Sequence, residues 1–241
     1  QMTACLLAII LFRKTSRIKV SLKNFKPNAQ IIKNIYSIAI PSGVMTSLPS
    51  ILVALLNSLL ATVSQTAIAF FGIYFKLQSF IYMPANGLIQ GMRPLISYNY
   101  GARHFDRVKK IIKVSIISTA VILCCGTIIF MGLPELVLSW FNATEQLLEI
   151  GIIGLRVISP CFILSTMGVV ISGVFESLGK GRQSLTISLL RQFIITLPLA
   201  YILLKVIGLN GIWLSFVIAE GIASVIAVIL IKKELHNFKV D

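Results

Sequence analysis

The sequence predicts an all-α integral membrane protein built around a bundle of six transmembrane helices. Hydrophobic residues make up 56% of its 241 residues and charged residues only 12%, with a mean hydropathy of +0.91. Its apolar runs are long enough to cross a hydrocarbon core of ~30 Å, which takes about 20 helical residues. Backbone polar groups in lipid must be paired internally, and the alternating segments of about ten residues typical of a membrane barrel are missing. The runs are therefore expected to be helical.

The apolar segments divide the chain in order. Residues 1–12 are apolar but rise only about 18 Å as a helix, so we expect the tail of a preceding transmembrane helix. Residues 13–34 form a basic connector on the cytoplasmic face, and a cytoplasmic tail follows at 232–241. The six-helix bundle occupies 35–231, with expected spans at 35–60, 66–92, 108–132, 147–175, 184–204 and 210–231.

Positive charge on alternate connectors predicts the orientation. Connectors 13–33, 93–113, 176–191 and 232–241 carry seven, six, three and three basic residues, nineteen of the 22 in the chain. The intervening connectors carry a single one, Lys205. Such a bias indicates cytoplasmic loops and a cytoplasmic C-terminus. It also explains the net charge of +14 without a nucleic-acid partner, since anionic lipid attracts basic residues at membrane boundaries.

Three ionisable residues fall near the middle of predicted spans, about 15 Å deep: Lys76, Arg156 and Glu220. A charge at that depth costs at least about 2.5–3.5 kcal/mol and should face the bundle interior with a partner. We expect Glu220 to pair with Arg156, Lys76 or both. The pair would be purely structural, or Glu220 would be a coupling group for a proton or cation. In the third alternative the three residues do not pair and lie on unrelated polar faces of their helices.

Two further sets of residues suggest a conformationally active bundle with a cavity. Asn57, Gln78, Asn86 and Gln192 cannot satisfy their amides on their own helices as Ser and Thr can, which makes them candidates for lining a cavity. Prolines remove a backbone donor and bend or break helices, as is common in transporters. Those inside predicted spans are Pro41, Pro49, Pro84, Pro160 and Pro198.

Enzyme chemistry finds little support in the sequence. His104 and His236 lie in a connector and in the tail. No Ser or Cys nucleophile lies near a plausible intramembrane base, and metal-ligand spacing is missing. The sequence therefore predicts a protein that is not an enzyme and has no cofactor.

Two stretches resemble the multidrug and toxic compound extrusion (MATE) family, in its bacterial multidrug-exporter branch. The first includes Tyr82-Met-Pro84-Ala-Asn-Gly87-Leu-Ile-Gln90-Gly91-Met-Arg-Pro94 and is similar to that family's eighth helix. The second starts at Phe175-Glu-Ser-Leu-Gly179-Lys-Gly181 and continues through Gly211-Ile-Trp213, similar to the tenth to twelfth helices. The resemblance covers essentially the whole chain.

This resemblance implies a twelve-helix antiporter made of two six-helix lobes around a central cavity. Such proteins lie in the plasma membrane and export cationic, amphipathic drugs in exchange for H⁺ or Na⁺ by alternating access. The chain would be the C-terminal lobe, and an N-terminal six-helix lobe would be its partner. Its cavity wall is expected to come from helices seven, eight and ten.

The coupling site of the family's sodium-dependent branch cannot be carried over. That branch has a Glu in helix seven and an Asp in helix ten. Here the seventh segment, 35–60, has no acid, and the tenth has only Glu176 at its cytoplasmic end. Coupling would then reside in the N-terminal lobe, which we favour, or at Glu220.

Two alternatives stay open. A flippase for lipid-linked saccharides shares this architecture and would need cations facing the cavity to hold a pyrophosphate, for which Lys76, Arg156 and Arg191 are candidates. A non-transporting membrane scaffold or an intramembrane enzyme is the alternative of another class.

Overall fold

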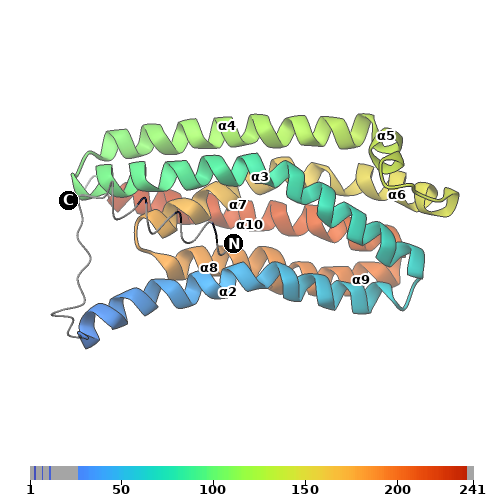
Figure 1. Ribbon diagram of the computed structural model, residues 1–241, viewed down its shortest axis with the longest axis horizontal. Helices are drawn as coiled ribbons and strands as arrows, with labels where there is room; N and C mark the ends of the chain where they lie inside the picture. The colour runs from blue at the N-terminus through green and yellow to red at the C-terminus, as the bar shows by residue number, and fades with distance from the viewer. Residues whose placement is uncertain (1–2, 4–6, 8–10, 12–26, 238–241) are drawn as a thin grey trace. The chain divides into compact units, whose positions relative to one another are not determined.

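The computed structural model describes Thr3, Leu7, Leu11 and residues 27–237 (Figure 1). The predicted tail helix 1–12, apart from those three residues, lies outside the described residues, as do most of the basic connector and residues 238–241.

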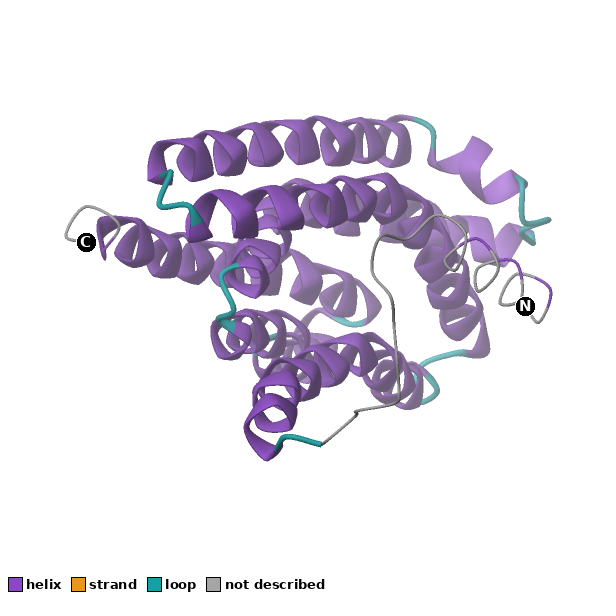
Figure 2. Cartoon of the chain, turned by 60° about the vertical axis from the view of Figure 1, so that its left-hand side comes forward, coloured by secondary structure: helices purple, strands orange, loops and turns teal. Residues whose placement is uncertain are grey.

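Gln1–Tyr36 and Ser37–Asp241 are separate compact units. The described residues of the second unit are helical without any strand, as Figure 2 shows. The elements are α2 (Ala29–Leu60), α3 (Gln65–Gly101), α4 (Phe105–Gly132), α5 (Pro134–Ser139), α6 (Glu145–Ile158), α7 (Pro160–Ser177), α8 (Gly181–Leu189), the π-helical η1 (Leu190–Ile194), α9 (Thr196–Ile207) and α10 (Leu209–Asn237).

The prediction of six membrane-crossing helices is confirmed. In the described part, six helical stretches are long and apolar enough to span a bilayer: Ala29–Leu60, Gln65–Gly101, Phe105–Gly132, Pro160–Ser177, Gly181–Ile207 and Leu209–His236. The expected fourth span, 147–175, is two helices instead of one, because α6 ends at Ile158 and α7 begins at Pro160. The short helix α5 lies in a connector for which the sequence predicted no helix.

The five prolines act in different ways. Pro41 and Pro49 lie inside α2 and Pro84 inside α3, and these helices continue past them. Helix α3 changes direction along its length (Figure 1). Pro160 is at the first turn of α7, where a missing N–H leaves no helical bond unmade. Pro198 follows the π-helical turn, in which the Ile195 amide donates to the Leu190 carbonyl at 3.0 Å.

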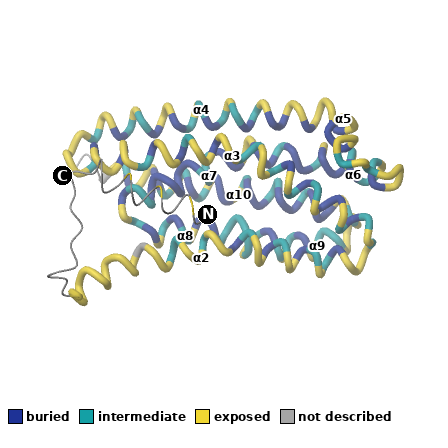
Figure 3. The backbone as a smooth tube through the Cα atoms, in the orientation of Figure 1, coloured by how far each residue is buried: buried dark blue, intermediate teal, exposed yellow. Residues whose placement is uncertain are grey.

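Helices α7 and α10 are the centre of the packing. Helix α7 contacts α3, α4, α8 and α10, while α10 also packs against α6 and α9. Burial follows this pattern, with long buried stretches on α7 and α10 and a wide exposed face on α4 (Figure 3). Two apolar clusters lie along the bundle. One includes Phe70, Phe162 and Trp213, and the other Ile96 and Val174.

The aromatic cluster depends on a glycine. The rings of Phe70 and Trp213 meet edge to face, with centroids 5.0 Å apart. A Cβ on Gly154 would lie 2.5 Å from the Phe70 ring and 3.3 Å from Trp213 Nε1. Glycine on α6 therefore lets three helices meet around these two rings.

We predict that Gly154→Ala destabilises the protein by about 1–3 kcal/mol, since neither ring can move without repacking the core. Gly72→Ala is the matched control, because its Cβ would meet nothing within 4 Å. Thermal unfolding of the purified full-length protein, followed by intrinsic fluorescence, measures both. Equal midpoints for the two variants would contradict this packing account.

Candidate functional site

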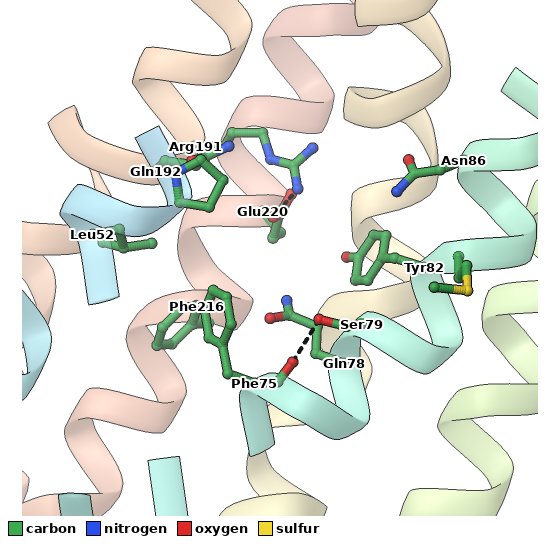
Figure 4. A pocket seen from close by; sticks show the side chains of 12 residues that line it. Leu52, Phe75, Gln78, Ser79, Tyr82, Asn86, Arg191, Gln192, Phe216 and Glu220 are labelled. Carbon is green, nitrogen blue, oxygen red and sulfur yellow. Dashed lines mark hydrogen bonds and ion pairs between the residues drawn. The ribbon is translucent and has the colours of Figure 1, made fainter. Parts of the chain in front are cut away.

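A pocket of about 400 Å³ opens among α2, α3, η1 and α10, shown from close by in Figure 4. Its volume falls in the range of small-molecule sites. The lining residues are Pro49 and Leu52 of α2, Phe75, Gln78, Ser79, Tyr82, Met83 and Asn86 of α3, Arg191 and Gln192 of η1, and Phe216 and Glu220 of α10.

Helical spacing explains how α3 supplies half of the wall. Phe75, Gln78, Ser79, Tyr82 and Asn86 follow one another at intervals of one, three or four residues, which places them on one face. Helix α10 contributes Phe216 and Glu220 by the same rule, four residues apart. The pocket is therefore built from regular helix faces and the π-helical turn.

The charged feature of the pocket is an ion pair between Arg191 and Glu220. Arg191 Nη2 lies 2.8 Å from Glu220 Oε1, and the two side chains are 14% and 11% exposed. Glu220 comes eleven residues after Leu209, the first residue of α10, which is about 16 Å into the helix. Two charges at this depth are tolerated because each neutralises the other.

The predicted pairing of Glu220 with Lys76 or Arg156 is wrong. Both of these cations are exposed on the described bundle, and neither lines the pocket. From the sequence, Arg191 was counted as the last basic residue of the connector 176–191, although it also falls inside the expected span 184–204. In the structure a helix already begins at Gly181, so Arg191 is ten residues into a membrane-crossing stretch.

Some hydrogen-bonding capacity in the pocket wall is unused. Glu220 Oε2, Arg191 Nε and Gln192 Oε1 are buried, and none has a hydrogen-bond partner within the described residues. Helix α7 passes close by, because a Cβ on Gly168 would lie 3.9 Å from Glu220 Oε2. One carboxylate oxygen is thus bound by Arg191, while the other is buried close to α7 without a partner among the described residues.

Aromatic rings line the pocket beside this carboxylate. Phe75, Tyr82 and Phe216 all contribute to the wall. The Tyr82 hydroxyl is 2.6 Å from the Ser165 hydroxyl, a hydrogen bond that fixes its ring. The faces of such rings attract cations as well as apolar groups. The pocket can therefore accommodate a flat or bulky apolar molecule that carries a positive charge.

The candidate amides separate into two groups. Gln78, Asn86 and Gln192 line the pocket, whereas Asn57 is outside it with its Oδ1 buried and unpaired among the described residues. The wall expected from helix ten, α7 in the structure, is supplied by η1 and α10 instead, since α7 has no residue in the lining. Tyr82 and Phe216 were missed, although each lies four residues from a candidate, Asn86 or Glu220.

A second group of ion pairs lies at the end of the bundle where α7 ends. Arg93 Nη2 is 2.6 Å from Glu176 Oε2, and the Ser184 hydroxyl donates to Glu176 Oε1 at 3.1 Å. Lys180 Nζ is 2.5 Å from Glu234 Oε1. Glu176 is thus held by Arg93 and Ser184, outside the pocket. No group of three or more metal-ligating side chains occurs in the described part of the chain.

Comparison with known proteins gives consistent matches. The MatE family profile matches residues 41–202. The chain is 31% identical over 239 residues to the multidrug export protein MepA of Staphylococcus aureus strain N315, covering 99% of this chain and 52% of the relative. For MepA of Staphylococcus haemolyticus strain JCSC1435 the identity is 31% over 240 residues, with the same coverage. The chain spans about half the length of the curated relatives it matches.

Solved structures show the same fold. An outward-facing multidrug resistance MATE family transporter of the MOP superfamily has a TM-score of 0.91 at 21% identity, covering 100% of this chain and 55% of that one. A MOP superfamily transporter from Pyrococcus furiosus, described as having a binding pocket of reverse polarity, has a TM-score of 0.90 at 22% identity, with 99% and 55% covered.

Removing one member of the buried pair should be far more costly than breaking an exposed pair such as Lys109–Asp106. We predict that Arg191→Ala, which leaves Glu220 buried and uncompensated, destabilises the protein by about 3–5 kcal/mol. Lys109→Ala is the comparison, because its partner Asp106 is fully exposed and is left in water when Lys109 is removed, so the loss should be close to neutral. Thermal unfolding of the two variants tests this, and similar losses would show that depth does not matter here.

Proposed function

The chain belongs to the MatE family, and on that premise we propose that the protein is a secondary active antiporter. It exports cationic, amphipathic drugs and other xenobiotics in exchange for H⁺ or Na⁺. This chain forms the C-terminal six-helix lobe, and a second six-helix lobe completes the central cavity. Membership in a family whose matched relatives are export proteins gives no support to the alternative of a scaffold or an enzyme.

The observation that carries this proposal is the chemistry of the pocket between α3, η1 and α10. Glu220 offers a carboxylate oxygen without a hydrogen-bond partner among the described residues. Phe75, Tyr82 and Phe216 line the same pocket as Glu220, and the amides of Gln78 and Asn86 add adaptable polar contacts. A carboxylate among aromatic rings favours an organic cation with apolar surface over an anion or a sugar.

Alternating access would give the prolines of the pocket helices a role. The two lobes would rock about the cavity and expose it to either side of the membrane. Pro49 and Pro84 lie on α2 and α3, two of the helices that line the pocket, where a bend changes the width of its mouth. The excess of basic residues in alternate connectors supports a cytoplasmic C-terminus in a bacterial plasma membrane. Arg191 is not one of the basic connector residues that support this orientation, since it lies in the pocket wall.

Coupling to the ion gradient is proposed first for the other lobe. In this lobe α2 has no acidic residue, and Glu176 of α7 is held by Arg93 and Ser184 away from the pocket. Glu220 is the second candidate. It is already engaged by Arg191, so a proton or Na⁺ would have to compete with a fixed positive charge. The same charge also opposes a drug cation, but the aromatic rings of the pocket favour a diffuse organic cation over a small ion, so the proposed role of Glu220 is to bind the drug together with these rings.

A flippase for lipid-linked saccharides is less well supported by the same pocket. A pyrophosphate needs an excess of cations facing it, whereas the single Arg of the lining is matched by Glu220 at 2.8 Å. Lys76 and Arg156 are exposed but do not line the pocket. The charge balance thus favours the drug antiporter.

Efflux of ethidium from proteoliposomes containing the full-length protein tests the proposed function. A proton gradient and a sodium gradient are imposed separately. We expect one of them to drive efflux, and the one that works identifies the coupling ion. Failure of both gradients with correctly inserted protein would overturn the antiporter proposal and favour the flippase.

We predict that Glu220→Gln lowers ethidium efflux about tenfold to a hundredfold, the loss of one charge-assisted contact of about 1.5–3 kcal/mol. Glu234→Gln, on the same helix but outside the pocket, should transport almost normally. Dependence on the gradient should persist in Glu220→Gln if coupling lies in the other lobe. Residual efflux that no longer responds to pH or Na⁺ would instead assign coupling to Glu220.

A further inference from the structure

A second hollow lies between α3 and α4, with a volume of about 540 Å³. Leu88, Gly91 and Leu95 contribute from α3, and Lys110, Val114 and Ser118 contribute from α4. Apart from Lys110, Ser115 and Ser118, the residues that line the wall are apolar. We call this hollow the α3–α4 groove.

The α3–α4 groove is separate from the pocket that holds Glu220. Successive helical residues are turned by about 100°, so the α3 residues that line the groove and those that line the pocket are centred roughly 160° apart. The groove and the pocket therefore use opposite faces of α3. Neighbouring apolar side chains of α4 are exposed, with Ile117 at 53% and Val121 at 58%. That side of α4 has the character of a lipid-facing surface.

Direction along the groove follows from the hairpin that joins its two helices. α3 ends at Gly101 and α4 begins at Phe105, so the helices run antiparallel. Leu95 and Lys110 lie near the hairpin end, and Leu88 and Ser118 lie deeper. From Lys110 to Ser118 the groove extends about 12 Å along α4.

Positive charge gathers at the hairpin end of the groove. Arg107 precedes Lys110 by three residues, on the same side of α4, and is exposed. The neighbouring acid, Asp106, pairs with Lys109 at 3.5 Å. Neither Arg107 nor Lys110 is in an ion pair within residues 27–237. Two uncompensated cations thus stand at the mouth of an apolar groove that runs along the membrane-crossing helices.

We propose that the α3–α4 groove is a binding site for an anionic phospholipid. The first part of one acyl chain lies along Leu88, Gly91 and Val114, and the phosphate group binds Lys110 and Arg107. An apolar chain continuous with a negative headgroup is the membrane component that matches this groove in both polarity and direction. The site is separate from the drug pocket, so the tests of lipid binding do not depend on the proposed transport function.

Native mass spectrometry of the full-length protein with added phosphatidylglycerol or phosphatidylcholine tests the charge at the mouth. We expect tighter retention of phosphatidylglycerol, reduced about fivefold by Lys110→Ala and further by adding Arg107→Ala. Lys113→Ala is the matched control, because Lys113 has the same charge and is exposed on the same helix but does not line the groove. Equal retention of both lipids, or an equal effect of Lys113→Ala, would overturn the site.

A second pair of variants tests the apolar part. A Cβ on Gly91 or on Gly87 would meet nothing within 4 Å, so both positions have open space for the start of a larger side chain. Only Gly91 of the two lines the groove. Gly91→Leu should therefore lower phosphatidylglycerol retention at least fivefold, while Gly87→Leu leaves it unchanged. Wild-type retention by Gly91→Leu would show that no acyl chain occupies the groove.

Discussion

The ion pair between Arg191 and Glu220 is the constraint on which the rest of this bundle depends. A charge about 16 Å along a membrane-crossing helix is tolerated when its partner is held beside it. The pair joins the α8–η1–α9 stretch to α10, and α7 passes next to it at Gly168. The π-helical turn Leu190–Ile194 includes the arginine itself. The position of three helices is thereby tied to one contact.

The same contact gives the pocket its character. Arg191 cancels the net charge of the site while Glu220 keeps one oxygen without a partner among the described residues. Aromatic rings of α3 and α10 line the same pocket as the Glu220 side chain. Such a wall suits the diffuse organic cation of the proposed function without demanding one shape. Recognition would rest on charge and apolar area, with few directional bonds.

Much of the fold could be predicted from the sequence because hydropathy and charge act over whole segments. The six spans follow from apolar length, and their ends fall close to basic or polar connectors. The interruption at Ser159 was not predicted, because apolar residues continue on both sides of Pro160 and helices often continue past proline. Pro84 is such a case, inside the continuous helix α3.

The site was predicted less completely, for a reason that Arg191 makes clear. Gln78, Asn86, Gln192 and Glu220 stood out because polar groups in apolar segments need a polar environment. The ion-pair partner of such a residue depends on which helices pack together, and no local sequence pattern indicates the helix packing. Arg191 falls where the expected connector 176–191 and the expected span 184–204 overlap, and the charge count assigned it to the connector. Three-dimensional packing alone identifies it as the partner of Glu220.

Charge reversal is the most direct test of this account. Thermal unfolding of the full-length protein would be measured for Glu220→Arg, for Arg191→Glu and for the two substitutions combined. We predict that each single reversal destabilises strongly, because two like charges then face each other, and that the combined protein recovers at least half of the loss. A combined protein as unstable as either single reversal would show that the pair does not organise the bundle.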